Sequence, residues 1–74
     1  MNFSELLVNS IKGEIETLEM ELNFIHNKDS ISPIEKIKRV KRILLNISQK
    51  KDILSLYINY ILESKQNQNG NDNS

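Results

Sequence analysis

The chain has 74 residues, with ten acidic and ten basic side chains and no cysteine. Its length allows one domain, its zero net charge gives no field that draws it to nucleic acid or a membrane, and the missing cysteines exclude disulfides and thiolate metal sites. The start of the chain has no signal-peptide pattern, and the apolar segment 53–62 is shorter than the roughly 20 residues of a membrane span. We therefore expect a small cytoplasmic protein without a membrane-inserted segment.

The first predicted element is a helix over residues 4–26, with Ser4 as its N-cap. Its apolar residues recur at alternating steps of three and four, which predicts one continuous heptad seam. The seam consists of Val8, Ile11, Ile15, Leu18, Leu22 and Ile25. The polar segment 27–32 then predicts a loop.

A second helix is predicted over residues 33–64. Ser32 suits the N-cap, Pro33 the first helical position and Glu35 the third position of a capping box. One heptad frame passes through residues 46–52 without a change of phase, which favours a single helix over a break near Ser48 and over a strand at 53–62. The frame consists of Ile37, Val40, Leu44, Ile47, Lys51, Leu54, Ile58 and Ile61.

The polar segment 65–74 lacks apolar anchors and is predicted to be a disordered tail. The fold class is therefore all-α: residues 1–64 form an antiparallel two-helix hairpin of the coiled-coil type. The expected layers pair Leu22 with Val40, Leu18 with Leu44, Ile15 with Ile47, Val8 with Leu54 and Ile11 with Lys51.

Acidic residues dominate the first helix, and basic residues dominate the segment "KIKRVKR" that opens the second. In a hairpin these flanks lie side by side, which favours intramolecular ion pairing over binding of phosphates. No aromatic residue interrupts the basic segment to stack on bases, so we expect no nucleic-acid partner. The flanks consist of Glu14, Glu16, Glu19 and Glu21 on one helix and Lys36, Lys38, Arg39, Lys41 and Arg42 on the other.

A hairpin buries one face of each helix, and the first helix carries a second periodic stripe. It is apolar at both ends and small in the middle, where Gly13 would permit close approach by another helix. In the second helix, three large residues also point away from the predicted seam. We name these nine residues the unpaired face and predict that they bind a protein partner: Leu6, Ser10, Gly13, Thr17, Met20, Phe24, Ile53, Leu56 and Tyr60.

The sequence shows no pattern typical of a catalytic or metal site. His26 is the only histidine, and its place at the end of a helix suits an interaction with the helix C-terminus. There is no glycine-rich phosphate loop, and the carboxylates lie on exposed flanks. We expect a protein that is not an enzyme and uses no cofactor.

The layout resembles the small E-type co-chaperones of type III secretion needle subunits, the YscE, SsaE and EscE group. The resemblance covers residues 4–62 and lies in size, in "SELLVNS", in the proline-led second helix and in "ILLNISQKKDILSLYINYIL". It implies a cytoplasmic hairpin that binds a larger tetratricopeptide-like co-chaperone, so that the pair keeps a secreted needle subunit unpolymerised. It also implies self-association when the partner is missing. The basic "KIKRVKR" departs from the pattern of that group.

Two other functions stay open. Residues 48–52, "SQKKD", partly resemble the "SQELD" signature of the Spo0E-like aspartyl-phosphate phosphatases, which act on response regulators and are also helical hairpins. Lys51 replaces the leucine of that signature, and the preceding helix is longer than in that group. The other possibility is a small helical protein for dimerisation or regulation.

Overall fold

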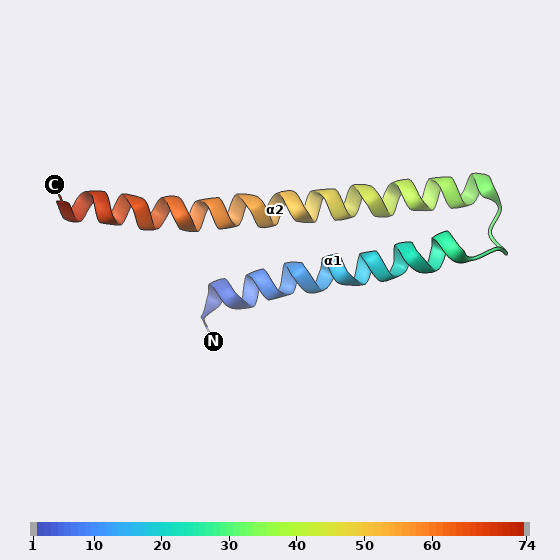
Figure 1. Ribbon diagram of the computed structural model, residues 1–74, viewed down its shortest axis with the longest axis horizontal. Helices are drawn as coiled ribbons and strands as arrows, with labels where there is room; N and C mark the ends of the chain where they lie inside the picture. Colours follow the sequence, from blue (N-terminus) through green and yellow to red (C-terminus); the bar gives the residue numbers. More distant parts are fainter. Residues whose placement is uncertain (1, 74) are drawn as a thin grey trace.

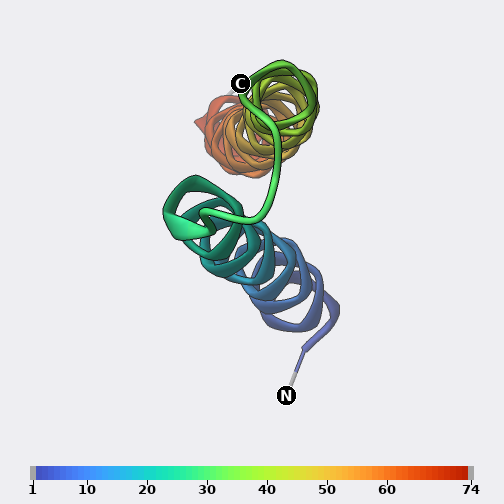
Figure 2. The same cartoon turned by 90° about the vertical axis from the view of Figure 1, so that its right-hand side faces the viewer.

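The computed structural model describes the backbone of residues 2–73 and the side chains of residues 2–65. It consists of two helices, α1 (Phe3–Asn27) and α2 (Pro33–Asn73), which run antiparallel side by side and are joined by a short loop (Figures 1 and 2). The longest dimension is 64 Å. Residues 2–73 contain no strand, and α2 is unbroken through residues 46–52. The predicted all-α hairpin is therefore confirmed.

The N-terminus of α1 is capped by Asn2, not by Ser4 as the sequence predicted. The Asn2 side-chain oxygen accepts a hydrogen bond from the backbone N–H of Glu5 at 2.8 Å, and Asn2 itself has an extended backbone. Asparagine and serine are about equally good N-caps, so composition alone does not choose between them. Ser4 lies inside the helix, where its hydroxyl meets the Tyr57 hydroxyl of α2 at 2.9 Å.

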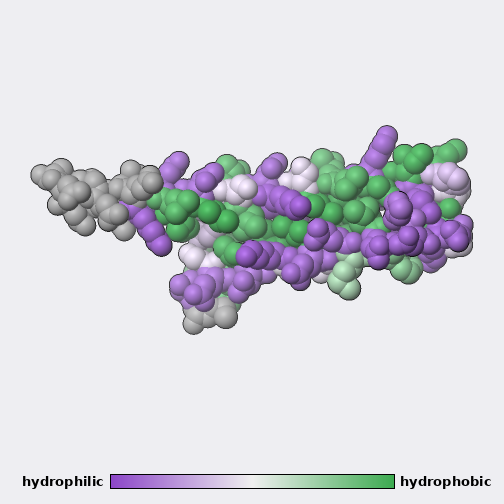
Figure 3. Space-filling model, viewed as in Figure 1, coloured by the Kyte–Doolittle hydropathy of each residue, from purple (hydrophilic) through white to green (hydrophobic). Residues whose placement is uncertain are grey.

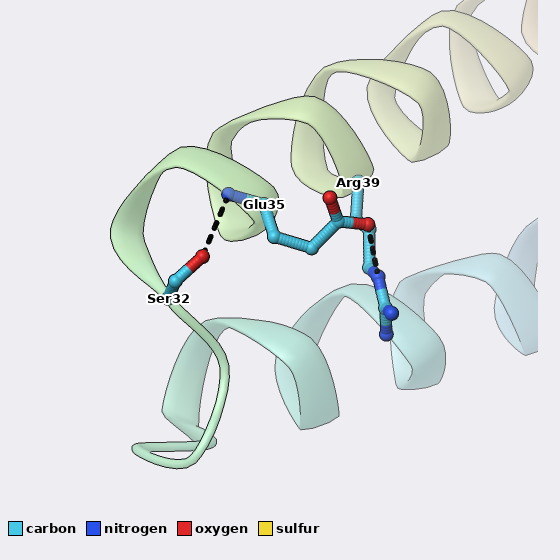
Figure 4. A network of polar contacts seen from close by, with 3 residues as sticks. All are labelled: Ser32, Glu35 and Arg39. Atoms are coloured by element: carbon cyan, nitrogen blue, oxygen red, sulfur yellow. Dashed lines mark hydrogen bonds and ion pairs between the residues drawn. The ribbon is translucent and has the colours of Figure 1, made fainter.

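The start of α2 follows the prediction, with one difference in the capping box. The backbone N–H of Glu35 donates to the Ser32 hydroxyl at 3.3 Å, and Pro33 takes the first helical position. The Glu35 carboxylate accepts a hydrogen bond from Arg39 Nε at 3.0 Å (Figure 4). The acidic side chain therefore supports the first turns of α2 as an ion pair four residues apart.

The helical backbone of α2 continues to Asn73, beyond the end predicted at Ser64. The side chains of the segment 66–74 lie outside the described residues. The disordered tail predicted for 65–74 therefore stays a prediction.

Among the described side chains the core is small and consists of five isoleucines. Partly buried leucines, Ile31 and Val40 pack around them, and no side chain among the described residues is fully buried. The seam predicted for α1 is confirmed, because all of its residues are buried or half-buried. The buried isoleucines are Ile11, Ile15, Ile25, Ile43 and Ile47.

The frame predicted for α2 is wrong at every second position. Ile37, Leu44 and Ile58 were expected in the seam but are 54%, 49% and 42% exposed, and Lys51 is exposed as well. Val40, Ile47, Leu54 and Ile61 keep their predicted places. In place of the four exposed residues, the seam contains the residue that precedes each of them, and these four are buried or half-buried: Lys36, Ile43, Lys50 and Tyr57.

This rotation of α2 has a physical basis in the contacts it creates. On the observed side, Ile43 is 5% exposed, Lys50 donates from Nζ to a Glu14 carboxylate oxygen at 3.0 Å, and Tyr57 reaches Ser4. The Leu18–Leu44 and Ile11–Lys51 layers therefore do not form as predicted. In the Leu22–Val40, Ile15–Ile47 and Val8–Leu54 layers, all six members are buried or half-buried.

Three polar contacts mark the register along the hairpin. At the end of the hairpin away from the loop, which we call the open end, Ser4 meets Tyr57. In the middle Glu14 meets Lys50, and at the loop end Lys36 Nζ donates to the His26 carbonyl at 3.1 Å. Because α1 begins opposite Tyr57, α2 continues past this point without a helix of the same chain beside it (Figure 1).

Candidate protein-interaction surface

All nine residues of the unpaired face are exposed. On α1, the side chain of Met20 is 73% exposed, and those of Leu6 and Phe24 are also more than half exposed. On α2 the same holds for Ile53, Leu56 and Tyr60. Their partner-binding role stays a prediction.

The two parts of the unpaired face lie on the same side of the hairpin. A shallow hollow beside α1 is lined by Ser10, Gly13 and Thr17 together with Lys50 of α2. Ile53 follows Lys50 by three residues, so the two lie on one side of α2. The small residues of α1 and Ile53 of α2 therefore adjoin one surface.

Gly13 lies at an open position in the middle of this surface. A Cβ atom built on it would meet no other atom within 4 Å, so no segment of the same chain requires a glycine there. Its carbonyl accepts a hydrogen bond from the Thr17 hydroxyl at 2.9 Å. The cost of glycine in a helix, about 1 kcal/mol relative to alanine, is therefore not offset by packing inside the hairpin.

At the open end, further apolar side chains extend the surface. Phe3, the first residue of α1, is 71% exposed, and the Tyr57 and Tyr60 rings stack with centroids 6.2 Å apart. Tyrosine suits a surface of this kind because its ring can be buried while its hydroxyl stays hydrated.

A second apolar surface, which the sequence did not predict, lies on the other side of α2. Ile37, Leu44 and Ile58 lie there, because the observed rotation of α2 leaves them outside the seam. In Figure 3 apolar side chains form a band along the line between the helices, with more apolar surface at the loop end. The only signal in the sequence was the width of the apolar arc of α2, which exceeds what one partner helix covers.

The charged flanks adjoin one another less extensively than predicted. Glu21, Glu35, Arg39 and Arg42 line one shared hollow. Among the described side chains, however, the ion pair between helices is Glu14–Lys50, whose lysine lies outside the predicted basic set. The preference for intramolecular pairing over nucleic acid therefore stays a prediction.

The residues considered for chemistry lie apart. His26 is exposed at the end of α1, and its carbonyl is held by Lys36. Gln49 and Asp52, which the phosphatase alternative would use, are exposed on α2. Within the part of the chain that the structure describes, no group of three or more acidic, histidine or cysteine side chains is placed to hold a metal ion.

Neither α1 nor the described part of α2 contains an apolar stretch long enough to span a bilayer.

Comparison with known proteins adds no relative. No family model, no curated protein and no solved structure matches this chain.

Proposed function

We propose that this hairpin is a protein-binding co-chaperone. In this proposal it forms a complex in the cytoplasm with a larger tetratricopeptide-like chaperone, and the complex keeps a type III secretion needle subunit unpolymerised. The specific partner rests on the resemblance to the E-type co-chaperones. The binding role rests on the surface of the molecule.

The observation that carries the binding role is the imbalance between core and surface. Among the side chains that the structure describes, five isoleucines are buried and thirteen large apolar residues are exposed. Burying one such side chain contributes about 1.5–3 kcal/mol. An excess of large exposed apolar side chains over buried ones favours a surface that a partner covers.

The unpaired face is the surface we assign to the chaperone. Small residues in the middle of α1 allow a partner helix to approach the backbone closely. Phe24 and Met20 at one end, and Leu56 and Tyr60 on α2, provide large side chains that a partner can bury. Aromatic residues at such positions contribute a large share of binding energy.

The test is co-expression with a tetratricopeptide-like chaperone and a needle subunit of a type III secretion system from the same source. We expect a soluble complex that elutes as one species and leaves the needle subunit monomeric. Gly13→Leu and Tyr60→Asp should each abolish co-purification while circular dichroism shows an unchanged helix content, because both positions are exposed and Gly13 has free space for a side chain.

A matched control is Asn9→Asp, at an exposed polar position of α1 outside the unpaired face, which should keep the complex. Full retention of the partner by both Gly13→Leu and Tyr60→Asp would contradict the assigned face. Failure of the wild-type chain to bind the chaperone would contradict the proposed function.

A further inference from the structure

A groove runs along the loop end of the hairpin, on the side of α2 opposite Ile43. Its floor is formed by half-buried Leu22 and Val40, and Ile37 and Leu44 form its α2 wall. His26 and Val40 line both halves of the groove, so the two halves are continuous. We name these residues the loop-end groove: Leu22, His26, Ile37, Val40, Lys41 and Leu44.

The spacing of the residues that line the groove suits a helix. Ile37 and Leu44 are separated by one heptad, and Val40 lies between them at the next step toward the seam. A third helix laid along this line would place its own heptad residues between Leu22 and Leu44, in the packing of a coiled coil. Leu44 is 49% exposed in the hairpin alone, and the third helix would bury this exposed part of its side chain.

The charges at the border of the groove select the kind of helix. Lys36 and Lys41 lie along its α2 side, and Pro33 of the first turn of α2 closes its end. The partial positive charge at the N-terminus of α2 adds to these two lysines. Glu19 lies on the α1 side. A helix in the groove is therefore favoured when its acidic flank faces α2.

We propose that the loop-end groove binds an amphipathic helix of another protein, whose apolar seam is flanked by acidic residues, and that the two form a three-helix bundle. The groove lies on the other side of α2 from Lys50 and Ile53. It is therefore separate from the unpaired face, and the hairpin has room for two protein segments at once.

The experiment uses the full chain and two labelled synthetic peptides of about three heptads. Both carry Leu and Ile at the seam positions; one has Glu at the flanking positions and the other has Lys. We expect fluorescence anisotropy to show that the acidic peptide binds about tenfold more tightly or better, with an affinity that falls as salt is added. Lys41→Glu should reverse the preference.

Leu44→Ser should weaken binding of the acidic peptide by about tenfold, because it removes apolar surface from the wall. Ile53→Ser is the matched control: its exposure of 53% is close to the 49% of Leu44, but it lies on the unpaired face, and it should leave peptide binding unchanged. Circular dichroism of each variant confirms that the helices are kept.

Three results would overturn the proposal. The first is equal binding, or no binding, of the two peptides. The second is a loss caused by Ile53→Ser as large as that caused by Leu44→Ser. The third is sedimentation showing that the free chain is a dimer which Leu44→Ser dissociates, with no binding of the acidic peptide; the groove would then be covered by a second copy of this chain.

Discussion

At the scale of single residues, the polar contacts of this hairpin explain its register better than its ion pairs do. Both ion pairs among the described side chains are about a third or more exposed, and pairs of that kind contribute about 0–1 kcal/mol. The Ser4–Tyr57 hydroxyl contact is part-buried and joins positions 53 residues apart in sequence. It therefore ties the start of α1 to one turn of α2.

Gly13→Ala is the residue-scale prediction. We expect it to raise the free energy of unfolding of the isolated chain by up to about 1 kcal/mol, because alanine is the better helix former and its methyl group meets no atom within 4 Å. Urea denaturation followed by circular dichroism measures the change. Asn9→Ala, at an exposed helical position without a glycine, is the control and should have a smaller effect.

The same substitution separates stability from function. If a partner helix approaches Gly13 closely, Gly13→Ala should weaken the complex even though it stabilises the hairpin. A variant that is less stable than the wild-type chain would show that Gly13 is constrained within the hairpin itself, against the open space observed there.

At the scale of the helices, the neighbours Ile43 and Leu44 distinguish the observed register from the predicted one. Ile43 is buried in the core and Leu44 is half exposed. We expect Ile43→Ala to lower the free energy of unfolding by about 2–4 kcal/mol, and Leu44→Ala to lower it by less than about 1 kcal/mol. Urea denaturation of the two variants provides the comparison, and the reverse order would show that the heptad frame read from the sequence is the right one.

The sequence predicted the elements well because strong local signals mark them. Ser32 and Pro33 fix the start of α2. In α1 only the seam is apolar at every position, because the second stripe is small or polar in its middle, and this leaves one choice of buried face. In α2, apolar residues lie on both sides of the line through Val40, Ile47 and Leu54. Local periodicity cannot choose between Ile43 and Leu44, because the choice depends on what α1 offers opposite them.

The candidate surface was predicted only in part, for the same reason. Residues opposite the seam of α1 are exposed whichever way α2 rotates, so Met20 and Leu6 were identified from spacing. Ile37 and Leu44 change from core to surface with a rotation of one residue. The loop-end groove therefore appears only when the two helices are packed.

At the scale of the whole molecule, two helices cannot enclose the apolar surface that this chain carries. A chain of this size commonly obtains no more than about 3–5 kcal/mol from its core. Over residues 2–65 that core has five buried side chains, none of them fully buried. The exposed apolar residues lie on both sides of α2, so a single partner helix would leave one side uncovered.

The last prediction follows from this balance. We expect the isolated chain to unfold at low urea concentration, with a free energy of unfolding below about 5 kcal/mol. A bound partner should raise that value by about 2.7 kcal/mol at a free concentration one hundred times its dissociation constant, because it binds the folded hairpin and not the unfolded chain. Thermal and urea unfolding with and without the co-expressed chaperone measure the difference. The need for a partner would be contradicted by an isolated monomer that resists unfolding and whose free energy of unfolding does not rise when the chaperone is added. Binding would then not stabilise the hairpin by burying its exposed side chains.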